Sequence, residues 1–253
     1  MSNSPLVSYT KLSPNHSGQR THAVDRITPH CVVGQCSVET LGNIFAPASR
    51  QASCQYGIGV DGRVGMYVEE KNRSWCSSSN ANDQRAITIE CASDATHPYA
   101  FNDTVYAKLI ELCVDICKRY GKTKLLWLGD KTKTLNYEPA SNEMVLTVHR
   151  WFANKSCPGD WMYARMGDLA SKVTAKLGGS AGGTEKPADN QVLYRVQTGA
   201  FSNKTNADAM LQKVKAAGFD TYMVKVDNLY KIQVGAFSKK ANADAMAAKL
   251  KAA

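Results

Sequence analysis

Short apolar runs in the first part of the chain predict the strands of a sheet. The runs at 27–33 and 86–91 have the length and the apolar character of buried strands. Two further runs, at 56–60 and 64–68, flank Asp61-Gly62-Arg63, which is typical of a tight hairpin turn. The pattern therefore predicts a sheet that includes a hairpin.

Helical periodicity alternates with these strands. Asn102 or Asp103 is a suitable N-cap for a helix that ends at Gly121. Pro158 is suited to open a last helix, whose expected apolar side contains Trp161, Met162, Met166 and Leu169. The alternation predicts an α/β domain with a central mixed sheet flanked by helices.

The end of the chain repeats itself. The segment 194–202 recurs, with conservative changes, at 230–238, and Asn206-Ala207-Asp208-Ala209-Met210 recurs 36 residues later. Each repeat predicts a strand, a turn and a helix, and 221–226 predicts another strand between them. Two units are too few for a solenoid, so we expect a small α+β sheet with two helices on one face.

A Gly- and Ser-rich stretch at 178–187 separates these parts. All four Trp and all eight Cys precede it. Because Gly/Ser-rich segments behave as flexible coil, we expect a boundary here. The predicted division is a domain at 1–177, a linker at 178–190 and a second domain at 191–253.

Composition and charge narrow the class of protein. With 43% hydrophobic and 21% charged residues the chain is globular, and its net charge of +9 favours a polyanionic partner such as nucleic acid, anionic lipid or a cell-wall polymer. No apolar run approaches the roughly 18 residues of a membrane span. The N-terminus lacks the pattern of a secretory signal, so we expect reduced, buried or metal-bound thiols rather than a disulfide framework.

Three side chains are candidate metal ligands. His149 and Cys157 lie eight residues apart before a Pro-Gly break, and His30 ends a short apolar strand. Imidazole nitrogen and thiolate sulfur are both good zinc ligands, and three protein ligands with an open fourth position are typical of a catalytic site. Spacing alone leaves the alternative of a core histidine and an inert buried cysteine open.

From about 13 to 177 the sequence resembles the zinc-dependent N-acetylmuramoyl-L-alanine amidases, the type shared with peptidoglycan recognition proteins. The resemblance rests on Ile27-Thr28-Pro29-His30, the hairpin at Asp61-Gly62, Trp75, Ile87-Thr88-Ile89-Glu90, and the segment 149–159. It implies the amidase fold, Zn²⁺ held by His30, His149 and Cys157, and cleavage of the amide between N-acetylmuramic acid and L-alanine.

The resemblance also implies roles for further residues. Glu90 matches a position that carries an acidic proton shuttle in several members, with an ordinary strand-end ion pair as the alternative. Lys155 matches a position that holds Lys or Thr in active members, where a cation would stabilise an oxyanion; the alternative is a solvated loop lysine. Independently of the resemblance, the aromatic side chain of Trp75 is a candidate for stacking on sugar or peptide, and a core role is the alternative.

Residues 191–253 resemble the SPOR domain, a small peptidoglycan-binding module, through the doubled Val-Gln-x-Gly-Ala-Phe pattern. This implies a ferredoxin-like α+β fold that binds glycan strands. Tyr194, Gln197 and Gln233, together with Tyr230, are the candidate contacts on the exposed face of the sheet.

Together these features predict a two-domain peptidoglycan hydrolase that uses zinc-activated water, with bacterial peptidoglycan as its partner rather than nucleic acid. We expect a phage or prophage endolysin, or a bacterial autolysin. The expected chain is made in the bacterial cytoplasm without a signal peptide and reaches the wall by holin-type release or non-classical export. The alternative is a catalytically inactive recognition protein, although such relatives commonly lack the ligand that Cys157 would provide.

Overall fold

The computed structural model describes residues 2–178, 194–219, 221–226, 228–237 and 240–251. The chain divides into two compact units, Met1–Glu185 and Lys186–Ala253. Apart from Gly178, the predicted linker at 178–190 lies outside the described residues. In the described part, no helix combines the length and the apolar character that crossing a bilayer requires.

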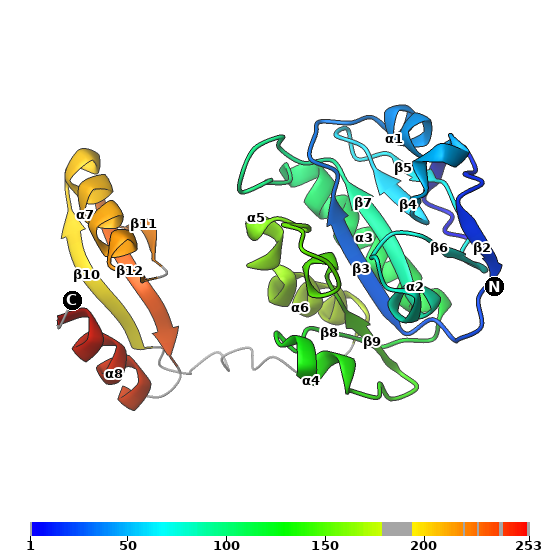
Figure 1. The fold of residues 1–253 in the computed structure, drawn as a ribbon. Coiled ribbons are helices and arrows are strands. Elements are labelled where there is room, and N and C mark those ends of the chain that lie inside the picture. The colour runs from blue at the N-terminus through cyan, green and yellow to red at the C-terminus, as the bar shows by residue number, and fades with distance from the viewer. Residues whose placement is uncertain (1, 179–193, 220, 227, 238–239, 252–253) are drawn as a thin grey trace. The chain divides into compact units, whose positions relative to one another are not determined.

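The first unit is built on a mixed sheet (Figure 1). Within the described residues this sheet has seven strands in the order β1-β5-β4-β7-β3-β9-β8, and only the β4–β5 hairpin pairs antiparallel. The strands are β1 (Val7–Thr10), β3 (Arg26–Cys31), β4 (Tyr56–Ile58), β5 (Val64–Met66), β7 (Ala86–Cys91), β8 (Lys124–Leu126) and β9 (Glu143–Leu146). A separate antiparallel pair consists of β2 (His16–Gln19) and β6 (Asn72–Ser74). The predicted hairpin and mixed sheet are confirmed.

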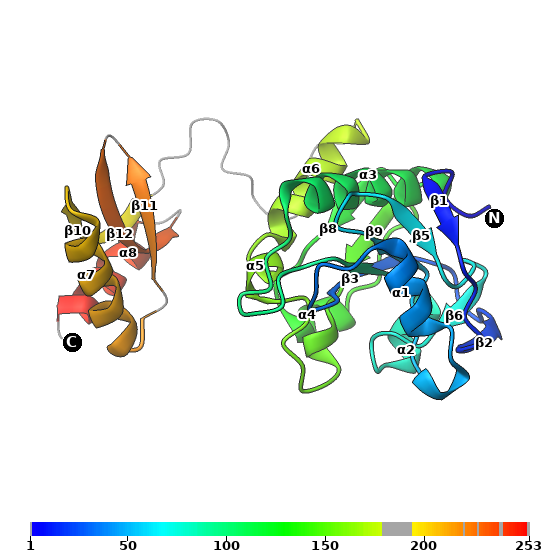
Figure 2. The same ribbon diagram turned by 90° about the horizontal axis from the view of Figure 1, so that it is seen from above.

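Helices cover both faces of the sheet. They are α1 (Val38–Phe45), α2 (Asn80–Arg85), α3 (Asp103–Arg119), α4 (Lys131–Leu135), α5 (Asp160–Tyr163) and α6 (Met166–Lys176), with the 3-10 turns η1 (Ala48–Arg50) and η2 (His149–Trp151). Figure 2 shows α3 and α6 along one face and α2 and α4 along the other. The core lies under α3, where the fully buried Leu109, Leu112 and Ile116 pack with Ile27 and Ile89.

The candidate site residues of β3 and β7 lie on the face of the sheet opposite the α3 core. Because successive side chains of a strand point to opposite faces, Ile27 and Ile89 face the core while His30 and Glu90 face α2. The predicted last helix is two helices, since α5 ends at Tyr163 and α6 begins at Met166. The N-cap at Asn102 is confirmed: its side chain accepts a hydrogen bond from the Val105 amide.

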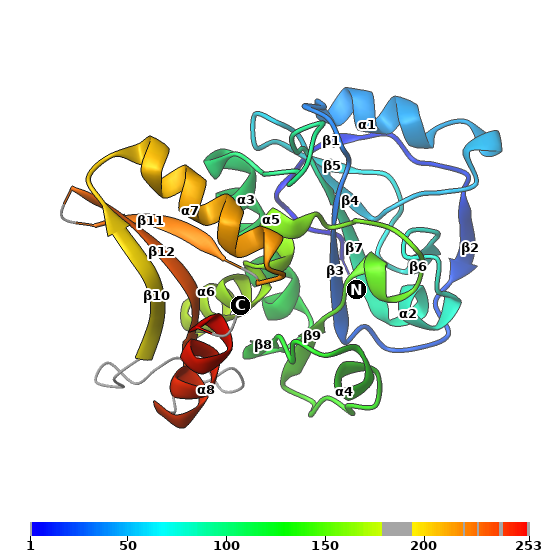
Figure 3. The ribbon, with the colours of Figure 1, turned by 60° about the vertical axis from the view of Figure 1, so that its left-hand side comes forward.

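In its described residues the second unit is a three-stranded antiparallel sheet, in the order β10-β12-β11, with two helices. Its described elements are β10 (Tyr194–Phe201), α7 (Lys204–Ala216), β11 (Tyr222–Val226), β12 (Leu229–Phe237) and α8 (Lys240–Lys251). Both helices pack on β10 and β12 (Figure 3), where Val196, Ile232 and Val234 are buried. The predicted small α+β fold is confirmed.

Candidate active site

The polar face of the sheet collects the candidate residues where three parallel strands end. His30 on β3 is the register partner of Glu90 on β7. β9 lies on the other side of β3, and the Thr147 amide donates to the Ile27 carbonyl at 3.0 Å, which places His149 just beyond the same edge. The carboxyl ends of parallel strands are where open α/β sheets hold their ligands.

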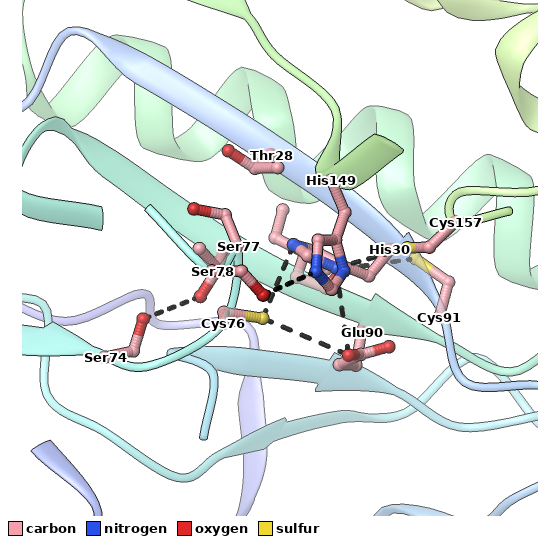
Figure 4. A network of polar contacts seen from close by, with 12 residues as sticks. Thr28, His30, Ser74, Cys76, Ser77, Ser78, Glu90, Cys91, His149 and Cys157 are labelled. Carbon is pink, nitrogen blue, oxygen red and sulfur yellow. Dashed lines mark hydrogen bonds and ion pairs between the residues drawn. The ribbon is translucent and has the colours of Figure 1, made fainter. Parts of the chain in front are cut away.

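His30, His149 and Cys157, the three candidate ligands, come together there (Figure 4). One ligand atom of each lies within 4.8 Å of the others, and the Nδ1 atom of His30 is 3.2 Å from the Sγ atom of Cys157. The centroids of the His30 and His149 imidazole rings are 5.1 Å apart. His30 is 1% exposed, and burial lowers its pKa well below the usual value, which keeps it neutral and able to bind a cation.

The loop between His149 and Cys157 is fixed by its own contacts. The Arg150 amide donates to the Cys157 carbonyl at 3.1 Å, which closes the loop across the two candidate ligands. The Arg150 guanidinium bonds Asp160 at 2.9 Å and lies 4.6 Å from the centre of the Tyr163 ring. Trp151 stacks on Trp127 with ring centroids 5.1 Å apart. These contacts hold the second and third candidate ligands near His30.

Glu90 is the acidic group of this cluster. Its Oε1 atom is 3.9 Å from Nδ1 of His30, and its buried Oε2 atom has no hydrogen-bond partner among the described residues. Burial raises the pKa of Glu90 to about 7, although the nearby Arg50 opposes the shift. A carboxyl group that titrates near neutrality can both accept and donate a proton there.

A cavity of about 570 Å³ opens over these groups. Lys155 and Trp75 line it together with Glu90 and His149. Lys155 is exposed, while Trp75 is half-buried and donates from its indole Nε1 to the Ser17 hydroxyl at 2.7 Å. The structure therefore brings every candidate of the first domain to one place, and Trp75 is not a core residue.

Cys76 also belongs to this cluster, although no sequence pattern distinguishes it from the other thiols. Its Sγ atom lies 3.4 Å from Nε2 of His30 and 4.0 Å from Oε1 of Glu90. The buried Asp83 carboxylate accepts the Cys76 and Ser77 amides, both at 3.1 Å, and so pins this loop. No local pattern marks Cys76. Its position depends on the hydrogen bond from its amide to Asp83, seven residues later, and this contact is evident only in the fold.

Two of the three candidates of the second unit, Gln197 and Gln233, lie in one cross-strand row, whereas Tyr194 pairs with Phe237. Gln197 pairs with Gln233, and Gln233 pairs with Tyr222 on the next strand. Gln197 is exposed and Tyr194 is half-buried, whereas Gln233 is 8% exposed and its side-chain oxygen accepts from the Tyr222 hydroxyl at 3.0 Å. Tyr222, which is 46% exposed, is the residue of this row that sequence reasoning missed.

Family models identify both units. One described as N-acetylmuramoyl-L-alanine amidase matches residues 19–160, and one described as SPOR domain matches residues 190–253. The chain therefore belongs to the N-acetylmuramoyl-L-alanine amidase family and carries a C-terminal SPOR domain, as predicted. It is a peptidoglycan amidase with a peptidoglycan-binding module.

Solved structures show related proteins. The peptidoglycan-binding domain of the Bacillus subtilis cell wall lytic enzyme CwlC is 48% identical over 26% of this chain and 84% of its own, with a TM-score of 0.24. PlyL is 14% identical over 65% of this chain and 95% of its own, with a TM-score of 0.47. The amidase LysC from Clostridium intestinale URNW is 16% identical over 69% and 96%, with a TM-score of 0.42. No curated protein matches significantly.

Proposed function

We propose that His30, His149 and Cys157 hold one zinc ion and that the enzyme hydrolyses the amide between N-acetylmuramic acid and L-alanine. The observation that carries the proposal is the meeting of these three donors within 4.8 Å of one another, beside a cavity that His149 lines. Two imidazoles and a thiolate are a donor set that zinc prefers, and three protein ligands leave one position for water or substrate.

The surrounding residues would move the protons. Zinc, when bound, lowers the pKa of a coordinated water and polarises a carbonyl. Glu90 would take the proton from the attacking water and pass it to the leaving L-alanine amine, since its carboxyl faces the ligands from the neighbouring strand. The Lys155 ammonium would stabilise the oxyanion, and Trp75 would contact the substrate at the cavity wall.

The SPOR domain would hold the enzyme on its substrate. We place glycan contacts at Tyr194 and at Gln197 and Gln233, the two glutamines being on the row that also contains Tyr222. Linking a binding module to a catalytic one raises the local substrate concentration without any new contact at the active site. The division into 1–177, 178–190 and 191–253 is part of this proposal.

The proposed place of action is the bacterial cell wall. We favour lysis by a phage or prophage, with wall turnover by an autolysin as the alternative. Phage lysis and autolysis require the same amide bond to be cut, so a test of the reaction does not depend on which of the two roles is correct.

Digestion of purified cell walls tests the reaction. We expect release of stem peptides with a free L-alanine amine, no new reducing sugar ends, and loss of release after treatment with a chelator. Added Zn²⁺ should restore it. Wall binding without any release would support the inactive recognition protein, and cleavage at another amide would refute the assigned bond. Mass spectrometry of the soluble products distinguishes these results.

Cys76 would orient His30. If the Nε2–H group of His30 donates to the Cys76 sulfur, the lone pair of Nδ1 points toward Cys157. Outer partners of this kind typically change metal affinity by about 10–100-fold. We therefore expect Cys76→Ala to weaken Zn²⁺ binding about tenfold in competition with a chromophoric chelator. Cys36→Ala is the matched control, and equal affinities for the two variants would contradict the role of Cys76.

A further inference from the structure

A second cavity of about 500 Å³ adjoins the catalytic one. The two cavities share Ser78 and Ser79, and the second extends to Arg26, Lys131 and Trp151. It lies between α2 and α4, two helices on the polar face of the sheet (Figure 2). The site described above therefore continues into a second arm.

Arg26 lies in line with the candidate ligands. Residues 26, 28 and 30 of β3 share one face of the sheet, because side chains alternate along a strand. Asn82 of α2 contacts two of them, donating to the Thr28 hydroxyl at 3.1 Å and accepting from Arg26 at 3.4 Å. At roughly 3.3 Å per residue, the backbones of Arg26 and His30 are about 13 Å apart.

Arg26 forms no ion pair within the described residues. It is 5% exposed, and the one side-chain hydrogen bond found for it in this part of the chain goes to a neutral amide. The adjacent Asp25 carboxylate is taken by Arg85, whose Nε donates to it at 2.9 Å. Burial and the neighbouring Arg85 guanidinium lower the pKa of Arg26, and the opposing effect of the Asp25 and Glu138 carboxylates does not cancel this shift. Burying a charge is costly unless it is paired, so an anion in this arm would be stabilised.

We propose that this arm binds a carboxylate of the stem peptide, with Arg26 as the principal contact and Lys131 at the rim. The inference rests on the proposed function, because it places the scissile amide beside His30. The glycan side of that amide carries no free carboxylate, whereas the stem peptide carries several. An extended peptide advances about 3.3 Å per residue, so the second to fourth stem residues reach Arg26. The stem therefore runs parallel to β3, past Ser78 and Ser79, toward Arg26.

The test compares two substrates that differ only in charge: an N-acetylmuramoyl tripeptide with free carboxyl groups and the same compound with carboxamides. We expect the wild-type enzyme to show a lower KM for the free acid. Arg26→Met should raise that KM about tenfold, with little change in kcat or in the KM for the carboxamide. Lys131→Ala should raise it about threefold, and Arg26→Lys should retain part of the preference. Lys133→Ala, an exposed change on the same helix outside the cavity, is the control.

Several results would overturn the subsite. One is that the wild-type enzyme has equal KM values for the two substrates. Another is that Arg26→Met raises the KM equally for both substrates, because this would indicate a structural role for Arg26. Titration calorimetry with the free-acid and carboxamide tripeptides measures the same preference without turnover. A wild-type protein that binds the acid selectively but cleaves neither substrate would refute the proposed hydrolysis while supporting the subsite. If Arg26→Met does not fold, Lys131→Ala and Arg26→Lys decide the question.

Discussion

Cys157→Ser is expected to abolish zinc retention and amidase activity together. Serine is close to cysteine in size, but its hydroxyl is not deprotonated at neutral pH, so one of three ligands is lost. We expect zinc affinity to fall at least a hundredfold and activity to fall by a similar factor. Metal content after gel filtration and release from cell walls are the two measurements.

The fold should tolerate this change. Cys157 is half-buried in a loop whose backbone is held by Arg150, and the Arg150 contacts do not involve the sulfur. Unfolding of the metal-free proteins should therefore differ little between the variant and the wild type. Cys36→Ser, which changes a half-buried thiol outside the three-ligand group, should keep both metal and activity. A Cys157→Ser protein that keeps its zinc and its activity would remove this residue from the site.

The sequence predicted those elements whose pattern is strong and local. The hairpin at Asp61-Gly62 and the helix capped by Asn102 carry their own signals, and both are present. The break between α5 and α6 was missed because the apolar residues on either side keep a helical spacing. The strands β1, β2 and β6 were missed because they are four residues or fewer and only partly buried.

The site residues could be predicted from the sequence only at positions that match the family's motifs. His30 and Glu90 are sixty residues apart in the chain and become neighbours through the β3–β7 register, which no local pattern reveals. Cys76 and Arg26 were missed for a related reason. A thiol in a short loop and an arginine at the start of a strand have ordinary roles in isolation. Cys76 matters because Asp83 holds its loop in place. Arg26 matters because the adjacent Asp25 pairs with Arg85 instead.

Glu90→Gln is expected to remove catalysis and, in the metal-free protein, to stabilise the fold at alkaline pH. Glutamine keeps the shape of the side chain but cannot accept the proton of the attacking water. General acid–base groups typically contribute about 10²–10⁴-fold to the rate, so we expect a loss in kcat of that order. Zinc content should stay near that of the wild type, because the three ligands are unchanged. Activity near the wild-type level would refute the role of Glu90.

The gain in stability follows from the sign of the pKa shift. Burial raises the pKa of Glu90 from 4.5 to about 7, so the folded protein holds this proton more tightly than the unfolded chain. The free energy of unfolding therefore falls as pH rises from about 4.5 to about 7, by about 3–4 kcal/mol at 1.36 kcal/mol per pKa unit. Glutamine is neutral throughout and avoids this loss. Chelator-treated Glu90→Gln should thus unfold at higher denaturant than the wild type at pH 8 and at nearly the same denaturant at pH 4. Glu111→Gln, an exposed change on α3, is the control and should show no such pH-dependent gain in stability. If Glu90→Gln were less stable than the wild type at pH 8, the Glu90 carboxylate would not be the uncompensated charge described here.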